Sequence, residues 1–92
     1  MTSTSYELVV VRSAARALRE NLPESVATAA IEFITGPLIE NPHRVGKRLR
    51  NELGGYWSAR RGTYRVIYQI KEARGEVIVT FVGHRRDMYR QR

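Results

Sequence analysis

Two stretches decide the fold of this chain: Tyr64-Arg65-Val66-Ile67-Tyr68-Gln69-Ile70 and, after a short polar interval, Glu76-Val77-Ile78-Val79-Thr80-Phe81-Val82-Gly83. Both are rich in β-branched and aromatic residues, and the interval from Lys71 to Gly75 has the composition of a turn. The second stretch is apolar almost without interruption, which is typical of a strand buried on both faces. We therefore predict two neighbouring strands, with residues 76–83 central in the sheet.

Two further strands are predicted on the N-terminal side of this pair. Tyr56 to Arg60 forms one, and Arg61-Gly62-Thr63 supplies a tight turn into the next strand. Near the start of the chain, the run from Tyr6 to Val11 is again β-branched and apolar. The expected sheet is small, four-stranded and mostly antiparallel.

The segment between the first strand and the other three is helical in character. Ala14 to Asn21 is rich in Ala, Leu and Arg, with Ser13 as its candidate N-cap, and a second helix is expected to begin at Pro23. We expect Gly36-Pro37 to end this second helix. Its apolar residues recur at i, i+4, i+7 and i+8 and form one stripe: Val26, Ala30, Phe33 and Ile34.

The remaining segments complete a β-α-α-β-β-β order. Leu38 to Arg50 contains Asn41-Pro42 and is expected to be a mobile basic loop, and the tail from Arg86 to Arg92 is expected to form a short helix. Because 92 residues provide one modest core, we predict a single α+β domain over residues 1–92. An N-terminal strand and a helical hairpin pack on its sheet.

Composition narrows the class of protein. The chain has no cysteine, which excludes disulfides and thiolate metal sites. No apolar stretch approaches the roughly 20 residues of a membrane span, and the start lacks the basic and apolar regions of a leader. We expect a cytoplasmic protein with no membrane partner.

Charge is concentrated in the second half of the chain. Residues 1–43 carry 3 Lys/Arg and 5 Asp/Glu, a balance of −2, whereas residues 44–92 carry 13 and 4, a balance of +9; together they give the net charge of +7. A basic half on a small domain suits a polyanion or an acidic protein partner. A solvated basic face that aids solubility is the alternative.

Arg65 is the first candidate for a functional role. An arginine within an otherwise apolar strand is costly unless its guanidinium reaches solvent or an anion, so we expect it to bind a phosphate. Pairing with Glu52 or Glu76 is the alternative.

The C-terminal run Gly83-His84-Arg85-Arg86-Asp87-Met88-Tyr89-Arg90 supplies the other chemistry-bearing side chains. In a helical tail, Arg85 and Tyr89 share a face at i and i+4. His84 is the residue here whose ordinary pKa lies near neutrality. The alternatives are a packed aromatic for Tyr89, a strand-end histidine for His84 and a surface ion pair between Arg86 and Asp87.

Further cations surround these residues in the sequence. We expect them to bind a nucleic-acid backbone: Arg60, Arg61, Lys47, Arg48, Arg50 and Arg86. Tyr56 and Trp57 are expected to be core or rim residues, with stacking on single-stranded RNA as the alternative.

Motifs that the sequence lacks also constrain the chemistry. It contains no HExxH, no Gly-rich phosphate loop and no Ser-His-Asp order, and its nine acidic residues include no close pair placed for Mg²⁺. We therefore expect no metal and no cofactor. A nuclease of this composition would use the 2′-hydroxyl of RNA as its nucleophile, with cations on the phosphate and an acid at the leaving 5′-oxygen.

The run from Leu49 to Tyr68, with Tyr56-Trp57-Ser58-Ala59-Arg60-Arg61-Gly62-Thr63-Tyr64-Arg65 at its centre, resembles the central motif of the RelE/ParE toxin superfamily. Gly83 to Arg90 resembles its C-terminal motif, and Asn41-Pro42-His43-Arg44 to Lys47-Arg48-Leu49 is similar to its linker. The resemblance covers nearly the whole chain and includes the β-α-α-β-β-β order.

The resemblance to the RelE branch implies a toxin of a type II toxin–antitoxin module. Such a toxin is a ribosome-dependent endoribonuclease that cleaves mRNA in the ribosomal A site without a metal, and a cognate antitoxin, expected to be acidic, holds it inactive in a hetero-oligomer. On this basis Arg65, Arg85 and Tyr89 match motif residues of the site. The alternatives are a ParE-like inhibitor of DNA gyrase and a member of the superfamily that binds antitoxin or RNA without cutting.

The chain departs from the RelE pattern in the first strand of the hairpin. RelE proteins place two lysines there, and this sequence has Trp57 and Ala59 at the approximate positions. Arginine is a poor general base because its pKa exceeds about 12. Proton transfer would therefore fall to His84 or Tyr89.

Overall fold

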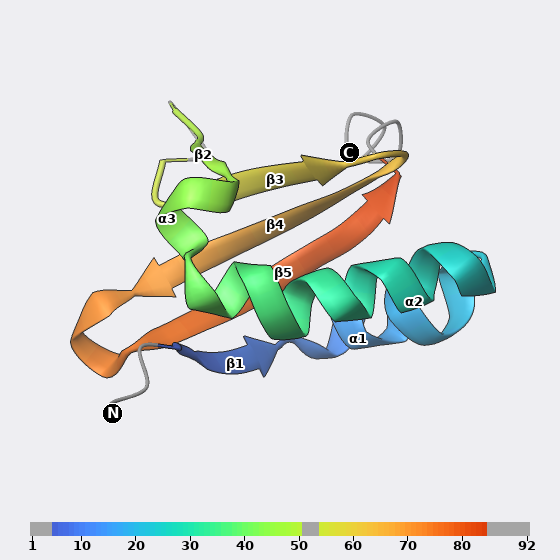
Figure 1. Cartoon of the computed structure of the whole chain (residues 1–92), viewed down its shortest axis with the longest axis horizontal. Coiled ribbons are helices and arrows are strands. Elements are labelled where there is room, and N and C mark those ends of the chain that lie inside the picture. The colour runs from blue at the N-terminus through green and yellow to red at the C-terminus, as the bar shows by residue number, and fades with distance from the viewer. Residues whose placement is uncertain (1–4, 51–53, 85–92) are drawn as a thin grey trace.

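The computed structural model describes residues 5–50 and 54–84, which form one five-stranded sheet with helices on one face (Figure 1). The α+β class is as predicted. The elements are β1 (Glu7–Val10), α1 (Arg12–Arg16) with a π-helical continuation η1 (Ala17–Asn21), α2 (Glu24–Phe33) with a π-helical continuation η2 (Ile34–Leu38), α3 (Pro42–Val45), β2 (Lys47–Arg48), β3 (Trp57–Arg61), β4 (Tyr64–Lys71), the 3₁₀ turn η4 (Glu72–Arg74) and β5 (Glu76–His84).

The strand order is β1-β5-β4-β3-β2, so the prediction of four strands was one too few. β1 runs parallel to β5, and every other pair is antiparallel. The additional strand, β2, lies in the segment that was expected to be a mobile loop: Lys47 pairs with Ser58, and Arg48 pairs with Trp57. Backbone pairing with β3 orders this segment. The side-chain pattern of two basic residues does not predict such pairing.

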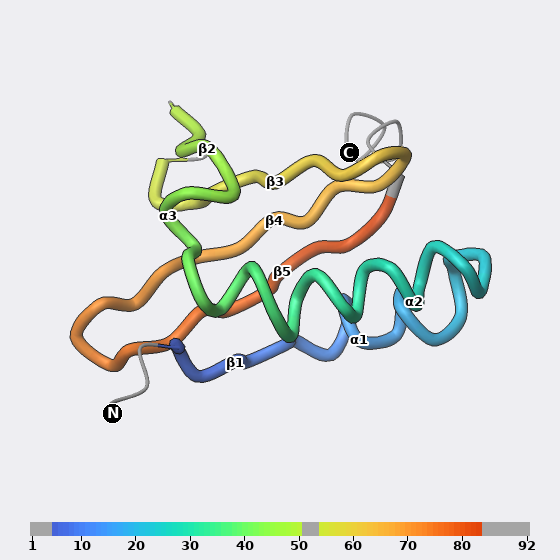
Figure 2. Tube along the Cα trace, viewed as in Figure 1, coloured from blue at the N-terminus to red at the C-terminus, as the bar shows by residue number. Residues whose placement is uncertain are grey.

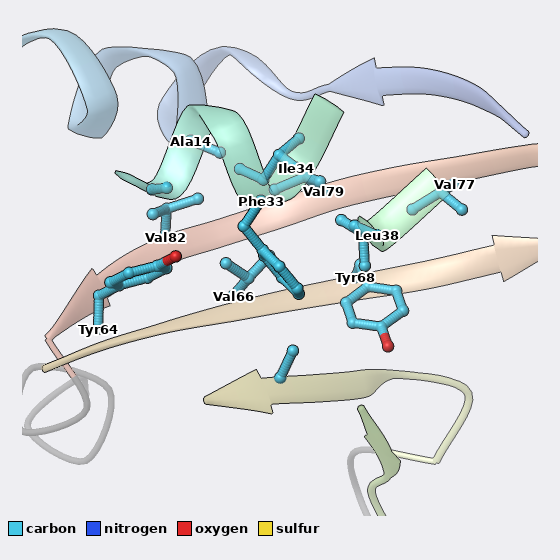
Figure 3. Packing of buried hydrophobic residues seen from close by; sticks show 12 residues of the cluster. Ala14, Phe33, Ile34, Leu38, Tyr64, Val66, Tyr68, Val77, Val79 and Val82 are labelled. Atoms are coloured by element: carbon cyan, nitrogen blue, oxygen red, sulfur yellow. The ribbon is translucent and has the colours of Figure 1, made fainter. Parts of the chain in front are cut away.

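The core lies between the helices and one face of the sheet (Figure 3). Tyr68, Val66, Val77 and Val79 are fully buried there against side chains from the helical layer: Ala30, Phe33, Ile34 and Leu38. The predicted stripe of the second helix is therefore confirmed. Burying an apolar side chain of this size contributes roughly 1.5–3 kcal/mol, which makes this single interface the main source of stability.

β5 is an interior strand, as predicted, but it is not buried on both faces. Val77, Val79 and Val82 are buried, whereas Ile78 and Phe81 are only partly so. The helices cover one face of the sheet and leave the other open, so a continuous apolar run here does not mean two covered faces.

Two predicted helix boundaries were wrong. Ser13 lies inside α1, which begins at Arg12 without a side-chain cap. Gly36-Pro37 does not end the second helix, because the chain continues through η2 with Pro37 inside it. The π-helical turn is wider than an α-helical one and gives the proline ring room, and the backbone turns away only at Asn41.

Tyr68 holds the segment between the helices and β2 in place. Its buried hydroxyl donates a hydrogen bond of 2.6 Å to the Pro42 carbonyl, and burial raises its pKa to about 12. Gly46 passes so close to this hydroxyl that a Cβ there would overlap it and would lie 2.9 Å from the Ser58 carbonyl oxygen. Only a glycine lets β2 approach β3 at this point.

An aromatic cluster of Trp57 and His43 continues from Tyr68. The Trp57 ring stacks on Tyr68 at 6.3 Å, and the His43 ring meets Trp57 edge-on at 5.4 Å. Glu72 then links η4 to α3 and to the residue that precedes β1, because its carboxylate lies 2.5 Å from His43 Nε2 and accepts a 2.9 Å hydrogen bond from the Tyr6 hydroxyl. These contacts explain why residues 42–48 are ordered.

We expect Gly46→Ala to lower the free energy of unfolding by about 1–3 kcal/mol, because the added methyl group must displace the Tyr68 hydroxyl or the Ser58 backbone. Chemical denaturation followed by circular dichroism measures this. Gly36→Ala is the matched control, since a Cβ at Gly36 meets nothing within 4 Å. Equal stability of the two variants would contradict the close approach described above.

Candidate nucleic-acid interface

The open face of the sheet carries the candidate site, and strand alternation decides which residues reach it. On β4, Tyr64, Val66 and Tyr68 belong to the core, which places Arg65 and Ile67 on the open face. Their partners on β3 are Arg60, opposite Arg65, and Ser58, opposite Ile67. On β2, Lys47 lies opposite Ser58 and completes the row of open-face residues.

A hollow of about 450 Å³ lies over this row and the edge of β3. It is lined by Arg44, Val45, Gly46, Lys47, Arg48, Leu49, Ser58, Arg60, Arg61 and Arg65. Among these lining residues, all from the described part of the chain, six of ten are Arg or Lys and none is acidic, so their fixed charge is suited to a phosphate-bearing ligand.

Arg65 is half-buried in the floor of this hollow. Its Nη1 donates a hydrogen bond of 3.2 Å to Ser58 Oγ, which fixes the direction of the guanidinium. Pairing with Glu76 is excluded by register, because Glu76 lies opposite Lys71 at the far end of β5 and its carboxylate is 3.3 Å from Arg74 Nη1. The other suggested partner, Glu52, lies outside the described residues.

Arg60 and Arg65 face each other directly across the two strands. The pair places two guanidinium-bearing side chains on the same face of adjacent strands. Guanidinium groups bind phosphate through paired hydrogen bonds, so this arrangement suits a phosphate-bearing ligand.

Arg61, by contrast, is largely taken up by packing. It follows Arg60 on β3 and therefore points to the helical side, where its guanidinium lies 4.5 Å from the centre of the Phe33 ring. Its Nη1 donates to the Arg60 carbonyl at 2.8 Å and its Nη2 to the Val45 carbonyl at 3.4 Å. It borders the hollow, but its orientation is set by the core.

The cations of the β2 segment are exposed. Arg48 lies 5.9 Å from the centre of the Trp57 ring, and a second hollow of about 620 Å³ adjoins these residues together with Lys47 and Arg50. Trp57 itself is enclosed by Tyr68, His43 and Arg48. Its packing matches the expectation of a core or rim residue rather than a stacking platform.

The C-terminal motif begins beside Arg65. Gly83 lies opposite Arg65, and His84, the last residue of β5, lies opposite Tyr64. Figure 2 shows this end of β5 reaching the turn between β3 and β4. Three predicted site residues, Arg85, Arg86 and Tyr89, lie outside the described residues, as does the expected C-terminal helix.

Strand alternation also revises the comparison with the two lysines of RelE proteins. Trp57 packs on the core cluster and Ala59 is buried in it, so neither position can present a group to the open face. The open-face positions of β3 are Ser58 and Arg60. The sequence analysis assigned no role to Ser58 or Arg44, which both line the hollow. The alternation of Ser58 with Arg60 along the strand could have indicated that Ser58 shares the face of Arg60. Arg44 lines the hollow because α3 places it there.

The tyrosines of β4 are unsuited to act as bases. Burial raises the pKa of Tyr64, an effect that the charge of Arg61 partly offsets, and its hydroxyl donates to the Ala29 carbonyl at 3.4 Å.

Within residues 5–50 and 54–84, no three His, Asp or Glu side chains gather as metal ligands would. In the same part of the chain, no helix has the length and apolar character needed to cross a membrane.

A small basic α+β domain with a cation-lined open sheet face matches known proteins over most of its length. Residues 10–89 match the family described as the ParE toxin of type II toxin–antitoxin systems, parDE. The toxin RelE of Mycobacterium tuberculosis is 47% identical over 85 residues, covering 92% of this chain and 87% of that protein. The toxin RelG of the same organism is 49% identical over 70 residues, covering 76% and 80%.

Solved structures show the same relationship. The toxin–antitoxin complex RelBE2 from M. tuberculosis contains a chain that matches with a TM-score of 0.83 and 42% identity, covering 87% of this chain and 91% of that one. The archaeal RelE–RelB complex from Pyrococcus horikoshii matches in fold, with a TM-score of 0.69 at 22% identity, covering 88% and 96%. This chain belongs to the RelE/ParE toxin family, as the motifs predicted. Its two relatives from M. tuberculosis are toxins named RelE and RelG.

We expect Arg60→Ala to lower the steepness of the salt dependence of RNA binding by about 0.7 in log K against log salt, because one phosphate contact is lost. A single-stranded 2′-O-methyl RNA, titrated by fluorescence anisotropy at several salt concentrations, measures this slope. Arg16→Ala on α1 makes the same change in net charge away from the hollow and should leave the slope unchanged. A slope equally reduced in both variants would indicate net charge alone.

Proposed function

We propose that this protein is the toxin of a type II toxin–antitoxin module and that it cleaves mRNA on the ribosome. The observation that carries the proposal is the hollow on the open sheet face, in which Arg65, directed by Ser58, faces Arg60 beside the start of the C-terminal motif. The relationship to toxins named RelE and RelG supports the same activity.

The proposed reaction uses a nucleophile that the RNA itself carries. The 2′-oxygen attacks the adjacent phosphorus and loses its proton, the bond to the 5′-oxygen breaks, and that oxygen takes up a proton. The products are a 2′,3′-cyclic phosphate, or a 3′-phosphate after hydrolysis, and a 5′-hydroxyl. Arg65 and Arg85 stabilise the charge that develops on the phosphate oxygens, because fixed cations need no reorganisation during the reaction.

Proton transfer falls to the C-terminal motif. Arg, Lys and Ser are the ionic and polar side chains that line the hollow in the described part of the chain, and none of them is a good base at neutral pH. His84 or Tyr89 fills this role in the proposal. Positioned proton transfer is worth roughly 10²–10⁴-fold in rate.

The ribosome supplies what this small domain lacks. The hollow is shallow and lies on a sheet face, so it can contact a backbone but does not enclose several nucleotides. Holding the 2′-oxygen in line with the leaving oxygen removes a large part of the activation barrier of the cleavage reaction. Free RNA is accordingly a poor substrate, and mRNA held in the ribosomal A site is a good one.

We further propose that an acidic antitoxin binds this protein and holds it inactive. The similar structure from M. tuberculosis is a toxin–antitoxin complex, and the one from P. horikoshii is a RelE–RelB complex. The charge of +9 on residues 44–92 favours an acidic segment, which would accelerate association at low salt.

We expect Arg65→Ala and Arg85→Ala each to slow cleavage of ribosome-bound mRNA by about 10²-fold or more, the effect of removing one preorganised donor. Tyr89→Phe tests the proton-transfer role. Single-turnover cleavage, with the product ends identified by mass spectrometry, measures these effects. Arg16→Ala serves as the matched charge control and should cleave at the wild-type rate.

A 2′-deoxy substitution at the scissile nucleotide should abolish the reaction. Cleavage of that substrate, or full activity of Arg85→Ala, would refute the mechanism. The family description also names ParE, so inhibition of gyrase supercoiling without mRNA cleavage would assign the protein to that activity instead. Binding of RNA or antitoxin without either activity would indicate a non-catalytic member.

The antitoxin proposal predicts a higher melting temperature when the toxin is mixed with the protein encoded by the adjacent open reading frame, because a ligand of the folded state alone stabilises it by mass action. Differential scanning fluorimetry at two partner concentrations measures this shift. An absent shift at micromolar concentrations, with both proteins folded, would count against that protein as the antitoxin.

A further inference from the structure

Phe81 is a partly exposed aromatic residue on the open face of the sheet. It lies opposite Ile67 on β4, and two residues further along β5 Gly83 lies opposite Arg65. Phe81 and Arg65 are therefore diagonal neighbours across two adjacent strands, a separation that an aromatic ring and an arginine can bridge. The helical layer covers the other face, so this ring takes no part in the core cluster.

The ring is directed along β5 toward the residue opposite Arg65. A Cβ built on Gly83 would lie 2.8 Å from Cζ of the Phe81 ring and 3.4 Å and 3.5 Å from its two Cε atoms. Gly83 is not among the glycines with positive φ, so its backbone does not demand glycine. What the missing side chain provides is room for the tip of the ring, which reaches along the strand to this position.

The surroundings of the ring fit one nucleotide. Arg65 lies on the adjacent strand, with Arg60 and Lys47 in the next two strands on the same side. Within residues 5–50 and 54–84, the acidic residues of the strands on the open face are Glu7 and Glu76, which lie opposite each other at the other end of β5. A flat apolar ring beside fixed cations matches a base joined to its phosphate, because every base offers a π-face for stacking.

We propose that Phe81 is a stacking platform for the base attached to the phosphate that Arg65 binds. This inference rests on the proposed RNA substrate and adds a positioning residue to that site. Stacking holds the nucleotide against the sheet whichever base it carries, and Gly83 is required so that the ring can lie over the strand. A side chain that packs without a π-face cannot replace it.

The test combines variants of Phe81 with a scan of the ligand. The probe is a single-stranded 2′-O-methyl RNA of eight nucleotides, which the proposed reaction cannot cleave, together with versions in which one base at a time is removed. Dissociation constants are measured by fluorescence anisotropy at one fixed salt concentration. Phe81→Leu keeps the apolar bulk, Phe81→Tyr keeps the ring, and Ile78→Leu is the control on the same strand and face at the end away from the cations.

With the wild-type protein, removal of one particular base should weaken binding by about 10-fold, the scale of one stacked base. Phe81→Leu should weaken binding of the intact RNA by the same factor and make it insensitive to that removal. Phe81→Tyr should restore both affinity and sensitivity, and Ile78→Leu should behave as wild type. Thermal melting of each variant shows that the fold is retained.

Unchanged sensitivity to every abasic position in Phe81→Leu would overturn the platform. Binding that still depended on Arg65 would in that case leave the proposed function standing. If instead Arg65→Ala bound as tightly as wild type, the RNA site itself would be refuted and the platform with it. Loss of affinity for the antitoxin in Phe81→Leu, with RNA binding intact, would also overturn the platform and assign the ring to the protein partner.

Discussion

The hydrogen bond from the Tyr68 hydroxyl to the Pro42 carbonyl is the contact on which the functional half of the molecule depends. Tyr68 is fully buried, so an unmade bond would leave a polar group without water, at a cost of about 1–3 kcal/mol. The bond fixes α3 at the end of the sheet, and Gly46 then allows the chain to pass the hydroxyl and pair as β2. Lys47 reaches the open face only because this short strand forms.

The packed core and the candidate binding residues lie on opposite faces of the sheet. Helices and sheet bury one apolar interface, and almost all of the packed side chains lie on that side. The open face is free to carry charge, and alternation along β3 and β4 sends Arg60 and Arg65 there while Trp57 and Tyr68 remain in the core. One strand can therefore support the fold with every second residue and present a binding group with the next.

The open face accepts local costs that the core does not. Arg60 and Arg65 are paired like charges, and Phe81 keeps an aromatic ring partly in water over a glycine. The nucleotide that we propose to bind here would supply a phosphate for the two arginines and a base for the ring. Sites of this kind are where local rules are broken, because selection acts on the complex and not on the free protein.

The sequence by itself determined the fold class, the order of the principal elements, the apolar stripe of the second helix and the membership of the family, because hydrophobic periodicity and turn residues act locally. It also made Arg65 a candidate site residue, since an arginine in an apolar strand needs a partner or solvent wherever the strand lies. Only the tertiary structure decided that β5 is covered on one face, that Leu38–Arg50 includes the strand β2, and that Arg61 packs on Phe33 whereas Arg60 faces the hollow. These outcomes depend on register and on which layer covers which face, and contacts between residues far apart in the chain set both.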